Sequence, residues 1–264
     1  MIGQEKIKNE LSKYSLNTLP QSILFLGEYG CGKHTLANEL AQSYNLPLVD
    51  ITEKVNLNTI TEIYNNPLTT MYLINIDELT DREQNVLLKL VEEPLSGTYI
   101  ILIASGTYCV LNTILNRCAT FSFECYTPEQ LRTFSDDESI LELCTTPGQI
   151  KSVNQSILKD TKLLASKIAE HIGEASFSNM LTIVNKVNFK DSYDKIDCIL
   201  LIRALAHYTE QLLGTTGNSV YYDMYMKIEK SLIKLRDSRL NKESLFTNLL
   251  IELWKISRGQ YGRL

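Results

Sequence analysis

Five short apolar runs alternate with helical patterns along the first 125 residues. They are SILFLG at 22–27, LPLVDI at 46–51, TMYLINID at 70–77, TYIILIAS at 98–105 and ATFSFE at 119–124. Continuous apolar runs of this length are typical of strands buried on both faces. Because strands and helices alternate, the pattern predicts an α/β fold built on a parallel sheet.

The strand pattern ends after Cys125, and only helical patterns follow. Thr127 as N-cap, Pro128 in the first turn and Gln130 as the capping-box partner predict a helix start. Longer helical patterns lie beyond a short region broken at Pro147, and one of them ends in Gly214 as a helix stop. We therefore predict three parts: a parallel-sheet domain at 1–126, a small helical region at 127–158 and an all-α domain at 159–264.

Composition favours a soluble, cytoplasmic protein. Of the 264 residues, 44% are apolar and 22% charged, with no apolar run long enough to span a membrane and no apolar signal at the polar N-terminus. The six cysteines are scattered without C-x-x-C spacing, and there are three histidines. We expect free thiols in a reducing compartment and no zinc site.

Charge is distributed unevenly along the chain. The formal net charge is −5, with the acidic excess in residues 1–158 and a basic excess in residues 159–264. Two interpretations of the basic stripe in the C-terminal part stay open: a solvated helix face, or a surface that faces a partner or DNA. The stripe consists of Lys227, Lys230, Lys234, Arg236, Arg239 and Lys242.

A phosphate-binding loop is predicted directly after the first apolar run. Gly27, Gly30, Gly32 and Lys33 lie in the sequence GEYGCGK, which fits G-x-x-x-x-G-K between a strand and a helix. In this loop the backbone N–H groups point into one concavity, and the lysine reaches the terminal phosphates. The expected cofactor is ATP or ADP. A glycine-rich turn without nucleotide is the alternative.

The residue after the lysine departs from the pattern. A Ser or Thr hydroxyl normally binds Mg²⁺ at this position, but the chain has His34, followed by Thr35. An imidazole is a poor ligand for a hard cation that prefers oxygen. Thr35 could replace the hydroxyl only if the helix start moved by one residue. Magnesium therefore stays optional, and we expect either nucleotide binding without efficient hydrolysis or an empty site.

Two carboxylates end the third apolar run. Asp77 could hold Mg²⁺ beside the phosphates, and Glu78 could orient or deprotonate the attacking water. An Asp-Glu pair after a strand can also simply cap the next helix. Its distance behind the P-loop favours the catalytic interpretation.

Several stretches together resemble the AAA+ clamp-loader ATPases. Ile2-Gly3-Gln4 resembles the family's N-terminal box against adenine, INIDELTDREQNVLLKLVEEP its acidic box and following helix, and YIILIASGTYCVLNTILNRC its sensor strand and S-R-C motif. The resemblance is detailed over residues 1–125 and extends beyond them only as a layout of lid and helical collar. It implies a P-loop AAA+ domain at 1–126, a lid at 127–158 and an oligomerising collar at 159–264.

The resemblance also assigns roles to individual residues. Arg117, kept beside Asn116 and Cys118, would be an arginine finger acting in trans on a neighbour's γ-phosphate. Ser105 or Thr107 would occupy the sensor position. The implied partners are other clamp-loader subunits in a hetero-pentameric ring, the sliding clamp, and primer–template DNA through the complex. We expect this chain alone to bind DNA weakly.

Departures from the family pattern favour a delta-prime-like subunit of DNA polymerase III. The four-cysteine zinc module is absent, the lid sequence TPGQ lacks the arginine expected there, and the P-loop hydroxyl is replaced. Such a subunit donates its finger while its own ATPase is weak or absent. The alternatives are an active gamma/tau-like loader ATPase or another AAA+ remodeller, and, less favoured, a P-loop kinase of small molecules.

Overall fold

The computed structural model describes residues 2–52, 60–61, 63, 69–77, 79–188, 196–235 and 240–259. By the density of their internal contacts, the residues form two compact units. The first contains Met1–Phe134 and Thr145–Gln149, and the second contains Ser135–Cys144 and Ile150–Leu264. The division into three parts at 126 and 158 stays a prediction.

A five-stranded parallel sheet forms the centre of the first unit, as the apolar runs predict. The strand order is β2-β3-β4-β1-β5, so β1 lies between β4 and β5. Leu26 at the end of β1 is paired with Ala104 on β4, which brings the carboxyl ends of these strands together. The strands are β1 (Ser22–Leu26), β2 (Leu48–Asp50), β3 (Thr70–Asn75), β4 (Thr98–Ala104) and β5 (Ala119–Ser122).

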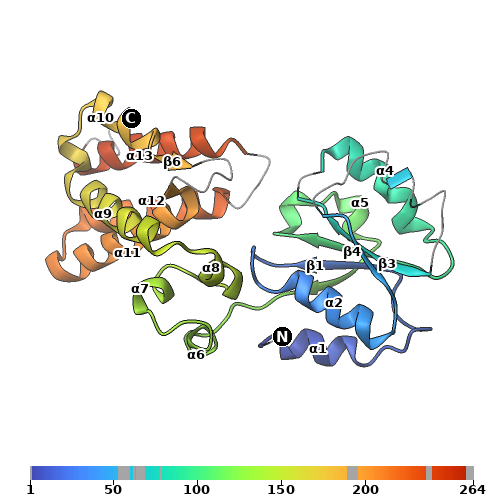
Figure 1. Cartoon of the computed structure of the whole chain (residues 1–264). Coiled ribbons are helices and arrows are strands. Elements are labelled where there is room, and N and C mark those ends of the chain that lie inside the picture. Colours follow the sequence, from blue (N-terminus) through green and yellow to red (C-terminus); the bar gives the residue numbers. More distant parts are fainter. Residues whose placement is uncertain are drawn as a thin grey trace. The chain divides into compact units, whose positions relative to one another are not determined.

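Helices cover both faces of this sheet. Figure 1 shows α1 and α2 on one face and α4 and α5 on the other. Successive strand residues point to opposite faces, so Ile23 and Phe25 pack with α1 and α2, whereas Leu24 packs with α4 and α5. The elements are α1 (Glu5–Leu11), α2 (Lys33–Ser43), α4 (Asp81–Glu92), η1 (Thr107–Cys109), α5 (Asn112–Leu115) and α6 (Pro128–Arg132).

Side-chain caps define the starts of two of these helices. The predicted capping box of α6 is confirmed: the Thr127 side chain accepts from the Gln130 N–H, and the Gln130 side chain accepts from the Thr127 N–H. Thr80 and Glu83 form the same arrangement at α4. Each capping box therefore satisfies two of the N–H groups at the helix start that have no intrahelical partner.

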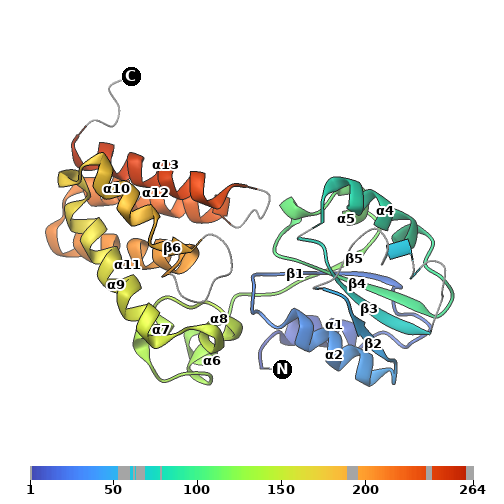
Figure 2. The same cartoon turned by 45° about the horizontal axis from the view of Figure 1, so that its top comes forward.

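The second unit is helical, as expected. Its long helices α9, α11, α12 and α13 pack side by side (Figure 2), and two very short parallel strands, β6 and β7, pair between α10 and α11. The elements are α7 (Glu138–Leu141), α9 (Gln155–His171), η2 (Ile172–Glu174), α10 (Phe177–Val184), β6 (Val187–Asn188), β7 (Ile196–Asp197), α11 (Cys198–Thr216), α12 (Ser219–Leu235) and α13 (Lys242–Ser257). Helix α8 (Pro147–Ser152) begins in the first unit and ends in the second.

The predicted stop at Gly214 is wrong. Helix α11 continues through Gly214 to Thr216 and ends at Gly217, which has the left-handed φ of 63° and donates its N–H to the Leu213 carbonyl. A glycine in a left-handed C-terminal position satisfies otherwise unpaired helix carbonyls, and Gly217 rather than Gly214 has that conformation. The helical pattern is therefore slightly longer than predicted.

The basic stripe and the expected absence of a membrane-spanning helix can be compared with the structure. Lys227 of the basic stripe forms an ion pair with Glu252 of α13, whereas Arg236 and Arg239 lie outside the described residues. Such pairing is typical of a solvated helix face that also ties two helices together. Among the helices that the structure describes, none has the length and apolar character needed to cross a bilayer.

Candidate functional site

The P-loop lies at the carboxyl end of β1, where the sequence predicts it. Gly27 follows the strand and donates its N–H to the Ala104 carbonyl at 3.0 Å. Gly30 and Gly32 have left-handed φ values of 80° and 102°, which favour glycine, and α2 starts at Lys33. The buried Lys33 ammonium donates to the carbonyls of Gly27 and Glu28, and burial lowers its pKa. The loop thus has the wrapped backbone that suits a phosphate.

A segment distant in sequence braces the outer side of this loop. The Thr146 hydroxyl donates to the Tyr29 carbonyl at 2.8 Å, and the Gly148 N–H donates to the Gly30 carbonyl at 3.0 Å. A side chain on Gly30 would lie 2.7 Å from the Thr146 hydroxyl oxygen, so both glycines are needed for this approach. The segment binds carbonyl oxygens of the loop. Neither bond occupies an N–H group of the loop, the kind of group that binds an anion in a phosphate loop.

The magnesium position does not fit that metal. The His34 Nδ1 lies 3.2 Å from an oxygen of Asp50, at the end of β2, and Thr35 is exposed on α2. Burial raises the pKa of Asp50, but hydrogen bonds from Thr52 and the charge of His34 outweigh burial and hold it below its usual value. An imidazole bonded to a carboxylate supplies no oxygen ligand.

The acidic strand end is engaged by the neighbouring strand. Asp77 follows β3 and accepts from the Ser105 N–H at 2.9 Å and from its hydroxyl at 2.6 Å. Ser105 directly follows β4, between β3 and β1, and of the two predicted sensor residues it is the one that contacts Asp77. Thr107 instead begins η1. Glu78, the predicted catalytic carboxylate, lies outside the described residues.

The N-terminal residues are tied to the strand beside the P-loop. The Gln4 amide exchanges two hydrogen bonds of 2.8 Å with the backbone of Glu124. The Tyr126 hydroxyl donates to the Cys31 carbonyl in the P-loop at 2.9 Å, and its ring lies against Gly3. The N-terminal box, β5 and the P-loop therefore form one connected structure.

Arg117 lies on the surface of the first unit, just after α5. Its side chain is 41% exposed, and its Nε lies 2.6 Å from a carboxylate oxygen of Glu92 at the end of α4. Its Nη1 donates to the Thr113 carbonyl at 2.9 Å. The structure therefore does not bury the guanidinium inside its own unit, the arrangement that would count most strongly against a finger.

Sequence reasoning missed three connections around this site. Buried Gln84 of α4 donates to the carbonyls of Leu79 and Cys109 and accepts from the Leu111 N–H. The Glu92–Arg117 pair and the brace on the P-loop were not predicted either. These connections join segments that are separated in the chain, so no local sequence pattern predicts them. The one available signal was Gln84 itself, because a glutamine on the apolar face of an amphipathic helix must find buried hydrogen-bond partners.

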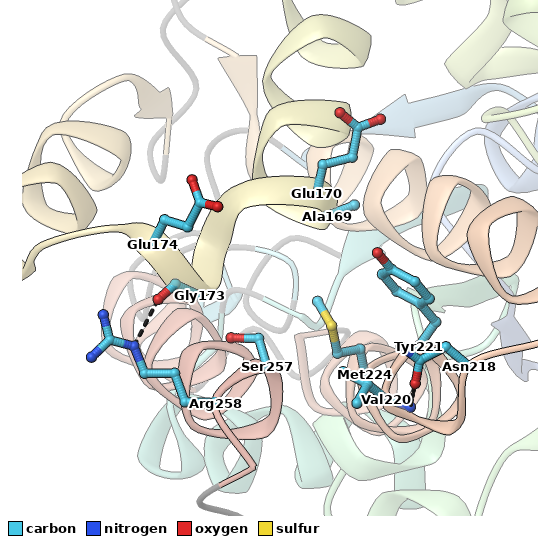
Figure 3. Close-up of a pocket in the computed structure, with 10 residues that line it drawn as sticks. All are labelled: Ala169, Glu170, Gly173, Glu174, Asn218, Val220, Tyr221, Met224, Ser257 and Arg258. Atoms are coloured by element: carbon cyan, nitrogen blue, oxygen red, sulfur yellow. Dashed lines mark hydrogen bonds between the residues drawn. The ribbon is translucent and has the colours of Figure 1, made fainter. Parts of the chain in front are cut away.

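A second concavity lies in the helical unit. A pocket of about 360 Å³ opens between η2, α12 and α13 (Figure 3). Arg258 donates to the Gly173 carbonyl at 2.7 Å beside it, and Glu170 and Glu174 line the same pocket. In the part of the chain that the structure describes, no three metal-binding side chains gather in one place. The P-loop region, with its converging loops and buried lysine, is the stronger candidate.

The strand order, the P-loop after β1 and the acidic end of β3 define a P-loop α/β domain of the AAA+ class, followed by a helical C-terminal region. Residues 49–127 match the family described as "DNA polymerase III, delta subunit". The chain is 36% identical over 69 residues to the replication factor C large subunit of Methanococcus aeolicus. The aligned stretch covers 24% of this chain and 15% of that protein's length.

Two solved structures show more distant likeness. A DNA polymerase III gamma-subunit-related protein of Thermotoga maritima is 15% identical, covering 96% of this chain and 99% of its own, with a TM-score of 0.49. A mutant RuvB of Thermotoga maritima is 16% identical, covering 98% and 88%, with a TM-score of 0.48. Likeness at this level adds nothing to the strand order and site. Each of the two sequence matches covers less than a third of the chain, and together with the site they support a likeness to the AAA+ clamp-loader family.

Proposed function

We propose that this chain is a delta-prime-like subunit of a DNA polymerase III clamp loader. In this role it supplies Arg117 as an arginine finger to the nucleotide site of a neighbouring ATPase subunit, and so supports ATP-dependent loading of the sliding clamp. Its partners are the other loader subunits of a hetero-pentameric ring, the sliding clamp and, through the complex, primer–template DNA. It acts in the cytoplasm.

The observation that carries this proposal is the combination of a half-exposed finger arginine with an altered magnesium position. Arg117 is accessible at the surface of the first unit, whereas His34 is bonded to Asp50 where a metal-binding hydroxyl is needed. A guanidinium presented to a γ-phosphate stabilises the charge that develops during phosphoryl transfer. A subunit with these two features contributes more to its neighbour's chemistry than to its own.

Features of the P-loop favour nucleotide binding without turnover. Its glycines and Lys33 keep the cradle for phosphates, and Thr146 and Gly148 of the brace donate their hydrogen bonds to loop carbonyls. ATP or ADP is therefore the proposed ligand, bound through backbone N–H groups and the lysine.

One observation supports the alternative of an active gamma/tau-like loader ATPase. The P-loop backbone and Asp77 are both in positions typical of working P-loop enzymes. Its test uses the purified chain alone: ATP hydrolysis that Glu78→Gln abolishes would establish the motor.

The delta-prime-like role is tested by assembly. The chain should hydrolyse no ATP by itself, should co-purify with loader ATPase subunits in one complex, and should raise their hydrolysis when added. Failure to join such a complex would overturn the proposal.

A further inference from the structure

Glu92 is the carboxylate closest to the proposed finger, and the proposed function leaves it without a role. It is the last residue of α4, and its side chain is 43% exposed. Figures 1 and 2 show α4 and α5 as neighbours on one face of the sheet, so the end of α4 lies beside the segment that carries Arg117. The contact between the two side chains is thus a consequence of how the two helices pack.

Two groups of the same unit fix the plane of the Arg117 guanidinium. Nε lies 2.6 Å from the Glu92 carboxylate, and Nη1 donates to the Thr113 carbonyl at 2.9 Å. The backbone at Arg117 is held as well, because its N–H donates to the Ile114 carbonyl at 3.0 Å. These contacts use Nε and one N–H of Nη1, and the guanidinium has two further N–H groups on Nη2 and one on Nη1 with which to meet an acceptor on another molecule.

The ion pair contributes little to folding, because both side chains are close to half exposed and such pairs are screened by solvent. Its effect on orientation is larger. An arginine side chain has several rotatable bonds, and ordering it only when a neighbour arrives would weaken its contact with the transition state. A finger that is already oriented avoids that loss.

We propose that Glu92 is a positioning residue that holds Arg117 ready for the nucleotide of the neighbouring subunit. This inference rests on the proposed function, since it assigns Glu92 a role only if Arg117 acts in trans. Glu92 itself touches no nucleotide. It acts through the orientation of the guanidinium, and so it should affect the rate of hydrolysis at the neighbouring site more than the binding of ATP there.

The experiment compares variants of this chain within the assembled loader complex. Glu92→Ala should lower kcat for ATP hydrolysis about tenfold and leave KM unchanged. Glu92→Gln, which keeps an acceptor oxygen for Nε, should lose less. The matched control is Glu93→Ala, which removes the neighbouring carboxylate and should stay within about twofold of the wild type. Assembly of each variant is checked by gel filtration, so a folding defect is recognised separately.

A double variant separates positioning from a general effect on structure. In the Arg117→Ala background, Glu92→Ala should cause no further loss, because the group that it orients is gone. The inference is overturned if Glu92→Ala changes kcat no more than Glu93→Ala does, or if it raises kcat. It is also overturned if Glu92→Ala lowers kcat by the same factor in the Arg117→Ala background as in the wild type. If Arg117→Ala alone leaves hydrolysis unchanged, the proposed function fails and the inference fails with it. If only Glu92→Ala is silent, the proposed function stands.

Discussion

Replacing Gln84 with alanine tests whether the centre of the P-loop domain is held together as described. The side chain is 1% exposed, and its amide makes three hydrogen bonds to backbone groups on two separate loops. Two of these bonds, to the carbonyls of Leu79 and Cys109, are buried, and the third, from the Leu111 N–H, is partly buried. Alanine cannot replace any of them.

The expected loss follows from the number of groups left without a partner. A buried backbone group that loses its hydrogen bond costs about 1 to 3 kcal/mol. The two buried carbonyls together predict a decrease of about 2 kcal/mol or more in the free energy of unfolding, and the partly buried Leu111 N–H and the cavity left by the truncated side chain add to it. The control is Asn85→Ala on the exposed side of the same helix, which should change stability by less than about 0.5 kcal/mol.

Urea denaturation followed by circular dichroism measures both variants. Hydrogen exchange should place the weakened amides in the loops around Leu79 and Leu111. A loss below about 1 kcal/mol, or no difference from Asn85→Ala, would refute the view that this glutamine joins the two loops.

Three other outcomes are expected. Gly148→Ala should speed hydrogen exchange in the P-loop, because the added Cβ would collide with the loop backbone. Gly214→Ala lies inside a helix with open space around it and should raise the free energy of unfolding by up to about 1 kcal/mol. The same change in the free energy of unfolding for both variants would contradict this. Burial raises the pKa of the Cys118 thiol to about 12, so only about one thiol in ten thousand is ionised at pH 8, and iodoacetamide should label exposed Cys125 far sooner. EDTA should leave the affinity of the wild type for ADP unchanged, whereas the affinity of His34→Ser should depend on Mg²⁺. A tenfold loss of wild-type affinity in EDTA would contradict this.

The sheet was predictable because its signal is local. Runs such as SILFL must be buried on both sides, and their alternation with helical patterns left few folds to consider. The capping box at Thr127 was predictable for the same reason. The end of α11 was not, because two nearby glycines both suit a helix stop and only the left-handed backbone at Gly217 distinguishes them.

The candidate site was predictable only in part. The P-loop is one continuous motif, and its context of strand and helix was visible in the sequence. The contacts of Asp77 with Ser105 and of Arg117 with Glu92 depend on which strands and helices lie side by side. That arrangement follows from the strand order, which cannot be predicted from any single stretch of the sequence.

The most direct test of the account is the rate of ATP hydrolysis at the neighbouring site when Arg117 is removed. Complexes assembled with wild-type chain, Arg117→Ala or the surface control Arg132→Ala are compared in single-turnover assays. Arg117→Ala should slow hydrolysis at the adjacent site by about a thousandfold while the complex still assembles, and Arg132→Ala should leave it unchanged. Hydrolysis within about twofold of the wild type in a fully assembled Arg117→Ala complex would contradict the account.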